Sequence, residues 1–181
     1  MATPPAEPSH VQSTDTAPSL VVATGGSATA GGTTTTATGA VSITAHDSGH
    51  ASTASGDASF QAAATGSAPT ADATTFLDIS GAHVIQIRES SGSTQGSTDA
   101  SAGSTLHFHV VANGSADPNG PVVIVHQQPF HGTADASGGN VAQVSAVAET
   151  HGTDTAAATS SDATTVENQF SLVHATSLIA V

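Results

Sequence analysis

Histidine has the widest chemical range of the residue types in this chain, and the sequence contains ten histidines. His107 and His109 are separated by one residue, so a β-strand would place both imidazoles on one face, about 6–7 Å apart. With a third imidazole such as His126 from a neighbouring strand, this pair could bind Zn²⁺ or Cu²⁺. We therefore take these three histidines as candidate metal ligands. The alternative is that they are polar surface residues in a chain without lysine or tyrosine, and that the protein has no cofactor.

Catalytic chemistry has little support in the sequence. The segment His46-Asp-Ser-Gly-His50 contains the residue types of a hydrolase triad, but no strand–Gly-x-Ser-x-Gly–helix context surrounds any serine. The chain has four glutamates, and it has no tryptophan or tyrosine on which a sugar ring could stack. Enzymes usually need convergent charged groups, and only 8% of these residues are charged. We predict that the protein is not an enzyme.

The charge of the chain excludes several classes of partner. One Arg and no Lys stand against 14 acidic residues, which gives a formal net charge of −13. Such a chain cannot neutralise nucleic-acid phosphates, and no apolar run reaches the roughly 18 residues of a membrane span. Because imidazole titrates near a pKa of about 6.5, acidification would move the net charge towards about −3. Reduced self-repulsion predicts that association rises as the pH falls.

The elements that position these residues are predicted to be strands. Residues 41–45, 83–89 and 105–112 alternate between the two faces of a strand, and residues 141–149 are expected to form a further strand. Residues 121–127 are apolar on both faces, which is typical of a central strand. No window shows helical spacing of apolar residues. We expect an all-β fold, either a β-sandwich or a small jelly-roll-like barrel.

The distribution of large apolar residues suggests two parts. Leu, Ile, Val and Phe number seven in residues 1–75 and 25 in residues 76–181. We therefore predict an extended Ala/Gly/Ser/Thr-rich arm over residues 1–75 and a β-rich core domain over residues 76–181. Residues 90–104 are expected to form a long loop, and residues 165–174 one strand. An arm of this kind would pair with a neighbouring subunit through its few apolar residues, Leu20, Val21, Val22, Val41 and Ile43.

These observations favour a structural role. Ala, Thr, Ser and Gly account for 103 of the 181 residues, and trypsin would find a single cleavage site, after Arg88. Short side chains and few protease sites suit a durable material outside a cell. We expect a self-associating subunit of a protective or adhesive assembly, such as a fibre or surface layer, located at the cell surface without a cleaved N-terminal signal. The alternative is a virion-surface protein that decorates or stabilises a capsid by binding its shell subunits. A small histidine-dependent metal-binding module is a third alternative.

Overall fold

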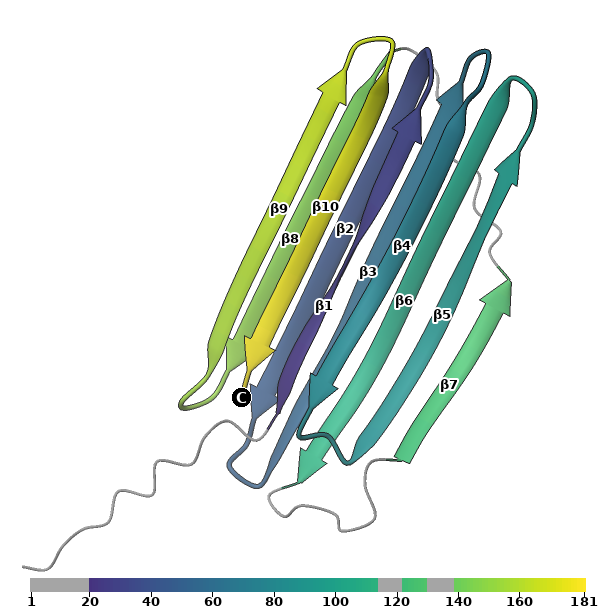
Figure 1. The fold of residues 1–181 in the computed structure, drawn as a ribbon. Coiled ribbons are helices and arrows are strands. Elements are labelled where there is room, and N and C mark those ends of the chain that lie inside the picture. Colours follow the sequence, from purple (N-terminus) through teal and green to yellow (C-terminus); the bar gives the residue numbers. More distant parts are fainter. Residues whose placement is uncertain (1–19, 114–121, 130–138) are drawn as a thin grey trace, which may run out of the picture.

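The protein is a two-layered β-sandwich, as the alternating patterns predict. The computed structural model describes residues 20–113, 122–129 and 139–181. These residues form strands and turns, and they contain no helix that could cross a membrane. The strands run along one long axis in two packed sheets (Figure 1). They are β1 (Val21–Gly31), β2 (Thr34–Asp47), β3 (Ala51–Thr65), β4 (Thr70–Ser80), β5 (Val84–Gln95), β6 (Asp99–Asn113), β7 (Val122–Pro129), β8 (Val141–His151), β9 (Ala156–Val166) and β10 (Phe170–Ala180).

Pairing in the two sheets is mostly antiparallel. The four-stranded sheet has the order β4-β1-β10-β9, and all its neighbours are antiparallel. The six-stranded sheet has the order β7-β5-β6-β3-β2-β8, and its edge strands β7 and β8 join their neighbours in parallel. The strands β1 and β10, distant in sequence, are central neighbours. Their pairing continues in two hydrogen bonds, from Leu20 N–H to Val181 O at 2.9 Å and from Val181 N–H to Leu20 O at 3.0 Å.

The core is built mainly from small side chains. Along β2, Val41, Ile43 and Ala45 are buried while Ser42 and Thr44 are exposed, because successive side chains of a strand point to opposite faces. Alanine is the commonest residue at the inward positions of β1, β3 and β6. Side chains this short let the two sheets approach closely, so burial is achieved with few large residues.

Phe60 on β3 is the largest fully buried side chain, and glycines make room for it. A Cβ atom on Gly39, its register partner in β2, would lie 2.5 Å from the ring. A Cβ atom on Gly26, in the facing sheet, would lie 2.6 Å from the ring. The ring therefore occupies space that any other residue at these positions would fill. Glycine is required here by packing.

A buried pair of hydroxyl groups also links the sheets. Thr35 Oγ1 of β2 and Ser171 Oγ of β10 lie 2.7 Å apart, and both residues are fully buried. Ser171 Oγ also lies 3.3 Å from the Thr35 carbonyl oxygen, to which it can donate. Buried hydroxyls are tolerated only when they are hydrogen-bonded, and this pair satisfies both partners. The Thr-rich segment therefore contributes to the core.

The predicted arm over residues 1–75 is wrong for the part that the structure describes. Residues 20–75 form β1, β2, β3 and the first half of β4, and the expected boundary at residue 75 falls inside β4. β1 lies between β4 and β10, and β3 lies between β6 and β2. The prediction counted large apolar residues, whereas Ala, Gly and Thr supply the buried surface here. Residues 1–19 lie outside the described residues.

The predicted subunit contacts are also corrected. Leu20 and Val22 have no exposed surface, and Val41 and Ile43 are 2% and 1% exposed. All four pack in the core of their own chain, so they cannot contact a second molecule without unfolding. Val21 is only partly buried and belongs to the outer face of the four-stranded sheet. The apolar residues of the expected arm therefore stabilise the monomer.

Three other segments differ from the predicted pattern. The loop expected over residues 90–104 is strand on both sides of a turn at residues 96–98, because Ser and Thr pair across it, as Thr94 Oγ1 and Ser101 Oγ do at 2.8 Å. The single strand expected over residues 165–174 is a hairpin of β9 and β10. Asn168 forms its turn at φ 57°, a conformation that Asn tolerates better than most residues. The segment expected to be a central strand, residues 121–127, instead contributes to the edge strand β7.

Candidate functional site

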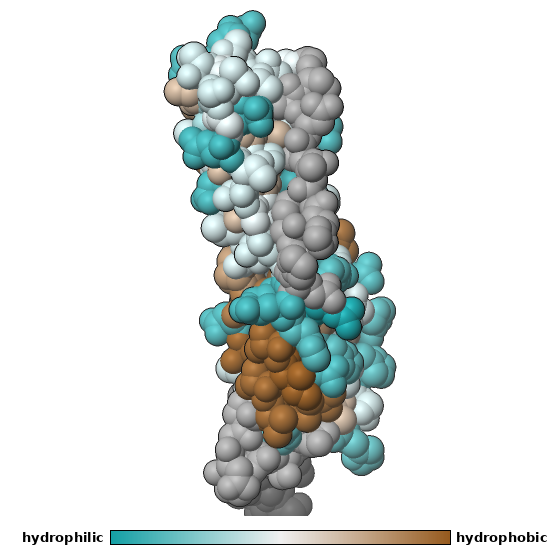
Figure 2. Space-filling view, turned by 90° about the vertical axis from the view of Figure 1, so that its right-hand side faces the viewer, coloured by the Kyte–Doolittle hydropathy of each residue, from teal (hydrophilic) through white to brown (hydrophobic). Residues whose placement is uncertain are grey.

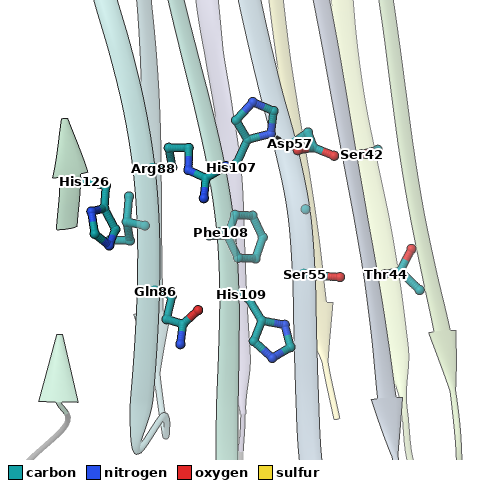
Figure 3. Close-up of a pocket in the computed structure, with 12 residues that line it drawn as sticks. Ser42, Thr44, Ser55, Asp57, Gln86, Arg88, His107, Phe108, His109 and His126 are labelled. Atoms are coloured by element: carbon teal, nitrogen blue, oxygen red, sulfur yellow. Dashed lines mark hydrogen bonds and ion pairs between the residues drawn. The ribbon is translucent and has the colours of Figure 1, made fainter. Parts of the chain in front are cut away.

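The outer face of the six-stranded sheet carries a row of titratable side chains. Register pairs Asp57 of β3 with His107 of β6, His107 with Arg88 of β5, and Arg88 with His126 of β7. Residues paired in register point to the same face, so these four side chains form a line across four strands (Figure 3). The line contains the single Arg of the protein.

A second row lies beside the first. His109 pairs with Ser55 on one side and with Gln86 on the other, two residues along from the first row. Both rows line a shallow hollow of about 380 Å³ on the sheet surface. Phe108 and Gly56 form part of its lining, and a Cβ atom on Gly56 would lie 2.7 Å from the Phe108 ring. The hollow is thus polar at its surface, with one aromatic ring beneath it (Figure 3).

One ion pair forms among the described residues, between His107 Nδ1 and Asp57 Oδ1. The two side chains are 57% and 60% exposed, so water and salt screen the pair strongly. Arg88 is exposed and has no carboxylate partner within the described part of the chain. The Glu89 carboxylate, which follows Arg88 in the chain, accepts a hydrogen bond from Gln127 Nε2 at 2.9 Å. The guanidinium therefore has donors available to a ligand.

The candidate metal ligands lie in one hollow but do not form a metal site. His107, His109 and His126 all line it. However, no group of three or more His, Asp or Glu side chains in the described residues is placed to hold a metal ion. β5 separates β6 from β7, which puts His126 about 10 Å from His107 at the usual strand spacing, with Arg88 between them. Sequence spacing predicted the shared face but could not reveal the intervening cation.

The His46–His50 segment is a turn. It joins β2 to β3, and Asp47 Oδ1 accepts hydrogen bonds from the Gly49 N–H at 2.9 Å and from Ser52 Oγ at 3.3 Å. Ser48 Oγ donates to the Ala51 carbonyl at 2.9 Å. The Asp and Ser side chains are therefore occupied in holding the turn, which explains this cluster without catalysis.

An exposed apolar edge is the feature that the sequence analysis missed. The side chains of β7 at Val122, Val123, Ile124 and Val125 are 57%, 52%, 40% and 50% exposed. β7 pairs with β5 alone among the described strands, and a hydrophobic patch marks this edge of the molecule (Figure 2). Figure 1 shows β7 at the side of the sandwich, beside β5. The prolines that bracket this segment, Pro121 and Pro129, are a signal typical of edge strands.

No protein-family model matches the chain, and no curated protein and no solved structure matches it. The protein is defined at the level of its class, as an all-β sandwich with a histidine-rich outer face and an apolar edge strand.

Proposed function

We propose that the protein is a non-catalytic structural subunit that self-associates through β7. The observation that carries this proposal is the exposure of four consecutive β-branched apolar residues on a strand whose second edge no described strand covers. Exposed strands of this kind are templates for pairing with another chain. Natural proteins usually protect such an edge with charge, and Val122–Val125 carries none.

The backbone of β7 is oriented for such pairing. The Val122 N–H donates to the His83 carbonyl at 2.9 Å, on the side of β5. Because backbone groups alternate sides along a strand, Val123 and Val125 direct their N–H and C=O groups away from β5. These two residues therefore offer donors and acceptors to an incoming strand. The occupant that fits is a second copy of β7, because an equally apolar strand would place apolar side chains beside Val122–Val125 on both faces of the sheet.

Two copies would meet antiparallel about a two-fold axis at Ile124. This axis pairs Val123 of one copy with Val125 of the other through both open hydrogen-bonding positions, and it places the two Ile124 side chains together. A two-fold contact of this type is the commonest in soluble oligomers. It would join two six-stranded sheets into one continuous sheet. Such a dimer is a building unit for a protective or adhesive assembly at the cell surface, which its small side chains and single trypsin site suit.

The test is a proline substitution that blocks the open edge. Val123→Pro removes an N–H that β5 does not use, so the intramolecular pairing should survive, whereas the second copy loses its donor. We expect wild type to be dimeric or larger by analytical ultracentrifugation at neutral pH, and Val123→Pro to be a folded monomer with the far-ultraviolet circular dichroism spectrum of the wild type. Val123→Thr keeps the N–H and is the matched control, which should still associate.

A charge variant separates edge pairing from other contacts. Ile124→Lys should also give a monomer, because two lysines would face each other across the axis. Val147→Lys places the same charge on the opposite edge strand β8, where Val147 is 49% exposed, and should leave the dimer intact. A wild type that is monomeric at high concentration, or a Val123→Pro protein that associates as wild type does, would overturn the proposal.

A further inference from the structure

The two outer faces of the sandwich differ in the type of titratable residue that they carry. Among the described residues, the outer face of the six-stranded sheet bears five exposed histidines and the single Arg, against three exposed acidic residues. In strand order these are His126, Arg88, His107, His109, Asp99, Asp57, His46, Glu149 and His151. In the described part of the chain, the outer face of the four-stranded sheet bears three exposed aspartates and one histidine, Asp72, Asp78, His174 and Asp162.

We propose that these faces bind each other between copies in acid, so that the outer face of the six-stranded sheet stacks on the outer face of the four-stranded sheet of a second copy. The contact deepens the proposed self-association by adding a pH control, and it uses the outer face of the sheet, to which β7 contributes His126, and leaves the open backbone edge of β7 unused. Its partner is another copy because the complementary acidic face is part of this same chain.

Whether the two faces repel or attract each other depends on the charged groups that each face carries. With neutral imidazoles, both faces carry more acidic than basic groups, so the two faces repel each other. Protonation of five imidazoles makes the histidine-rich face positive, while three aspartates against one imidazole leave the other face negative. Imidazole takes up its proton near a pKa of about 6.5, well above the range where aspartate is neutralised. Attraction therefore appears between about pH 6.5 and pH 4.5.

Arg88 provides the contact with a fixed positive charge near the β7 edge of the sheet. It lies in the hollow between the strands of His107 and His126, and it has no carboxylate partner in the described part of the chain. A guanidinium presents parallel donors that suit a carboxylate. The acidic face also offers two exposed apolar side chains, Phe76 at 42% and Leu178 at 39%, which would lose contact with water in a stack. The charges determine the pH at which the two faces bind, and the burial of apolar side chains increases the affinity.

A mixing experiment tests the proposal in the Val123→Pro background, which removes the β7 contact. One variant carries Arg88→Gln, His107→Gln and His126→Gln, and lacks the basic face. The other carries Asp72→Asn, Asp78→Asn and Asp162→Asn, and lacks the acidic face. We expect the background protein to be monomeric at about pH 7.5 and to form growing assemblies at about pH 5. Each variant alone should stay monomeric at both pH values.

An equimolar mixture of the two variants at the lower pH should form a one-to-one dimer that does not grow, because each molecule keeps one competent face. Added salt of about 0.5 M should weaken this dimer at least about tenfold. His50→Gln removes an imidazole from the β2–β3 turn, outside both faces, and should leave the pH response of the background unchanged. A variant that still associates alone, or a mixture that stays monomeric, would overturn the stacking contact. Neither result would affect the β7 proposal, which is measured at neutral pH.

Discussion

Phe60→Ala lowers the free energy of unfolding by about 3–5 kcal/mol, the cost of emptying a fully buried aromatic site. Phe60 has no exposed surface and lies between the two sheets, against glycines of both. Gly26 and Gly39, which lie against the ring, have no side chains that could fill the space that the ring leaves. The loss is therefore at the upper end of what one substitution causes in a domain whose total stability is about 5–15 kcal/mol.

Urea unfolding followed by far-ultraviolet circular dichroism measures this loss, since the chain has no tryptophan or tyrosine to report by fluorescence. Phe76→Ala is the matched control, because Phe76 is 42% exposed on the outer face and leaves no cavity. It should cost well under half as much as the core substitution. Equal losses for the two phenylalanines would show that Phe60 does not hold the sheets together.

Gly39→Ala destabilises the protein by about 1–3 kcal/mol, although alanine is otherwise the better strand residue. The new Cβ atom would lie 2.5 Å from the Phe60 ring and 3.3 Å from a Val173 methyl group. Both neighbours are side chains, and Gly39 has no left-handed backbone requirement, so the penalty comes from side-chain contacts, mainly with the ring. The same unfolding measurement detects it.

A double-mutant cycle identifies the ring as the cause. In the Phe60→Ala background the obstacle is gone, so Gly39→Ala should become neutral or stabilising. Gly26→Ala is the control, because its Cβ atom would also meet the Thr74 carbonyl oxygen at 2.1 Å, a backbone atom that the Phe60 substitution does not remove. It should stay destabilising in both backgrounds. Additive costs for Gly39→Ala and Phe60→Ala would contradict the packing described here.

The faces of the central strands were predictable because alternation is local. The placement of His107 and His109 on the face opposite Leu106, Phe108 and Val110 follows from the period of two along a strand, and the structure confirms it. In β5, too, Ile85 points inward while Gln86 and Arg88 point outward. The outward direction of about half of the side chains in the exposed row could therefore be predicted from the sequence.

The neighbours across the sheet were not predictable. Nothing in the local pattern places Arg88 between His107 and His126, because strand order and register are set by pairing between distant segments. The same limit explains why β7 was expected at the centre of a sheet. A strand that is apolar on both faces is stabilised when both faces are buried. An edge strand that pairs with a second molecule has the same sequence pattern as a buried central strand.

The sequence by itself determined that the protein is acidic and all-β, and which side of each clearly alternating strand faces inward, because charge and two-residue periodicity depend on composition and nearest neighbours alone. Tertiary structure decided that residues 20–75 belong to the core and that β7 stands at an edge. The physical reason is that small residues count as core only when two sheets lie close enough to bury them. That spacing depends on where Phe60 and its glycines meet across the sandwich.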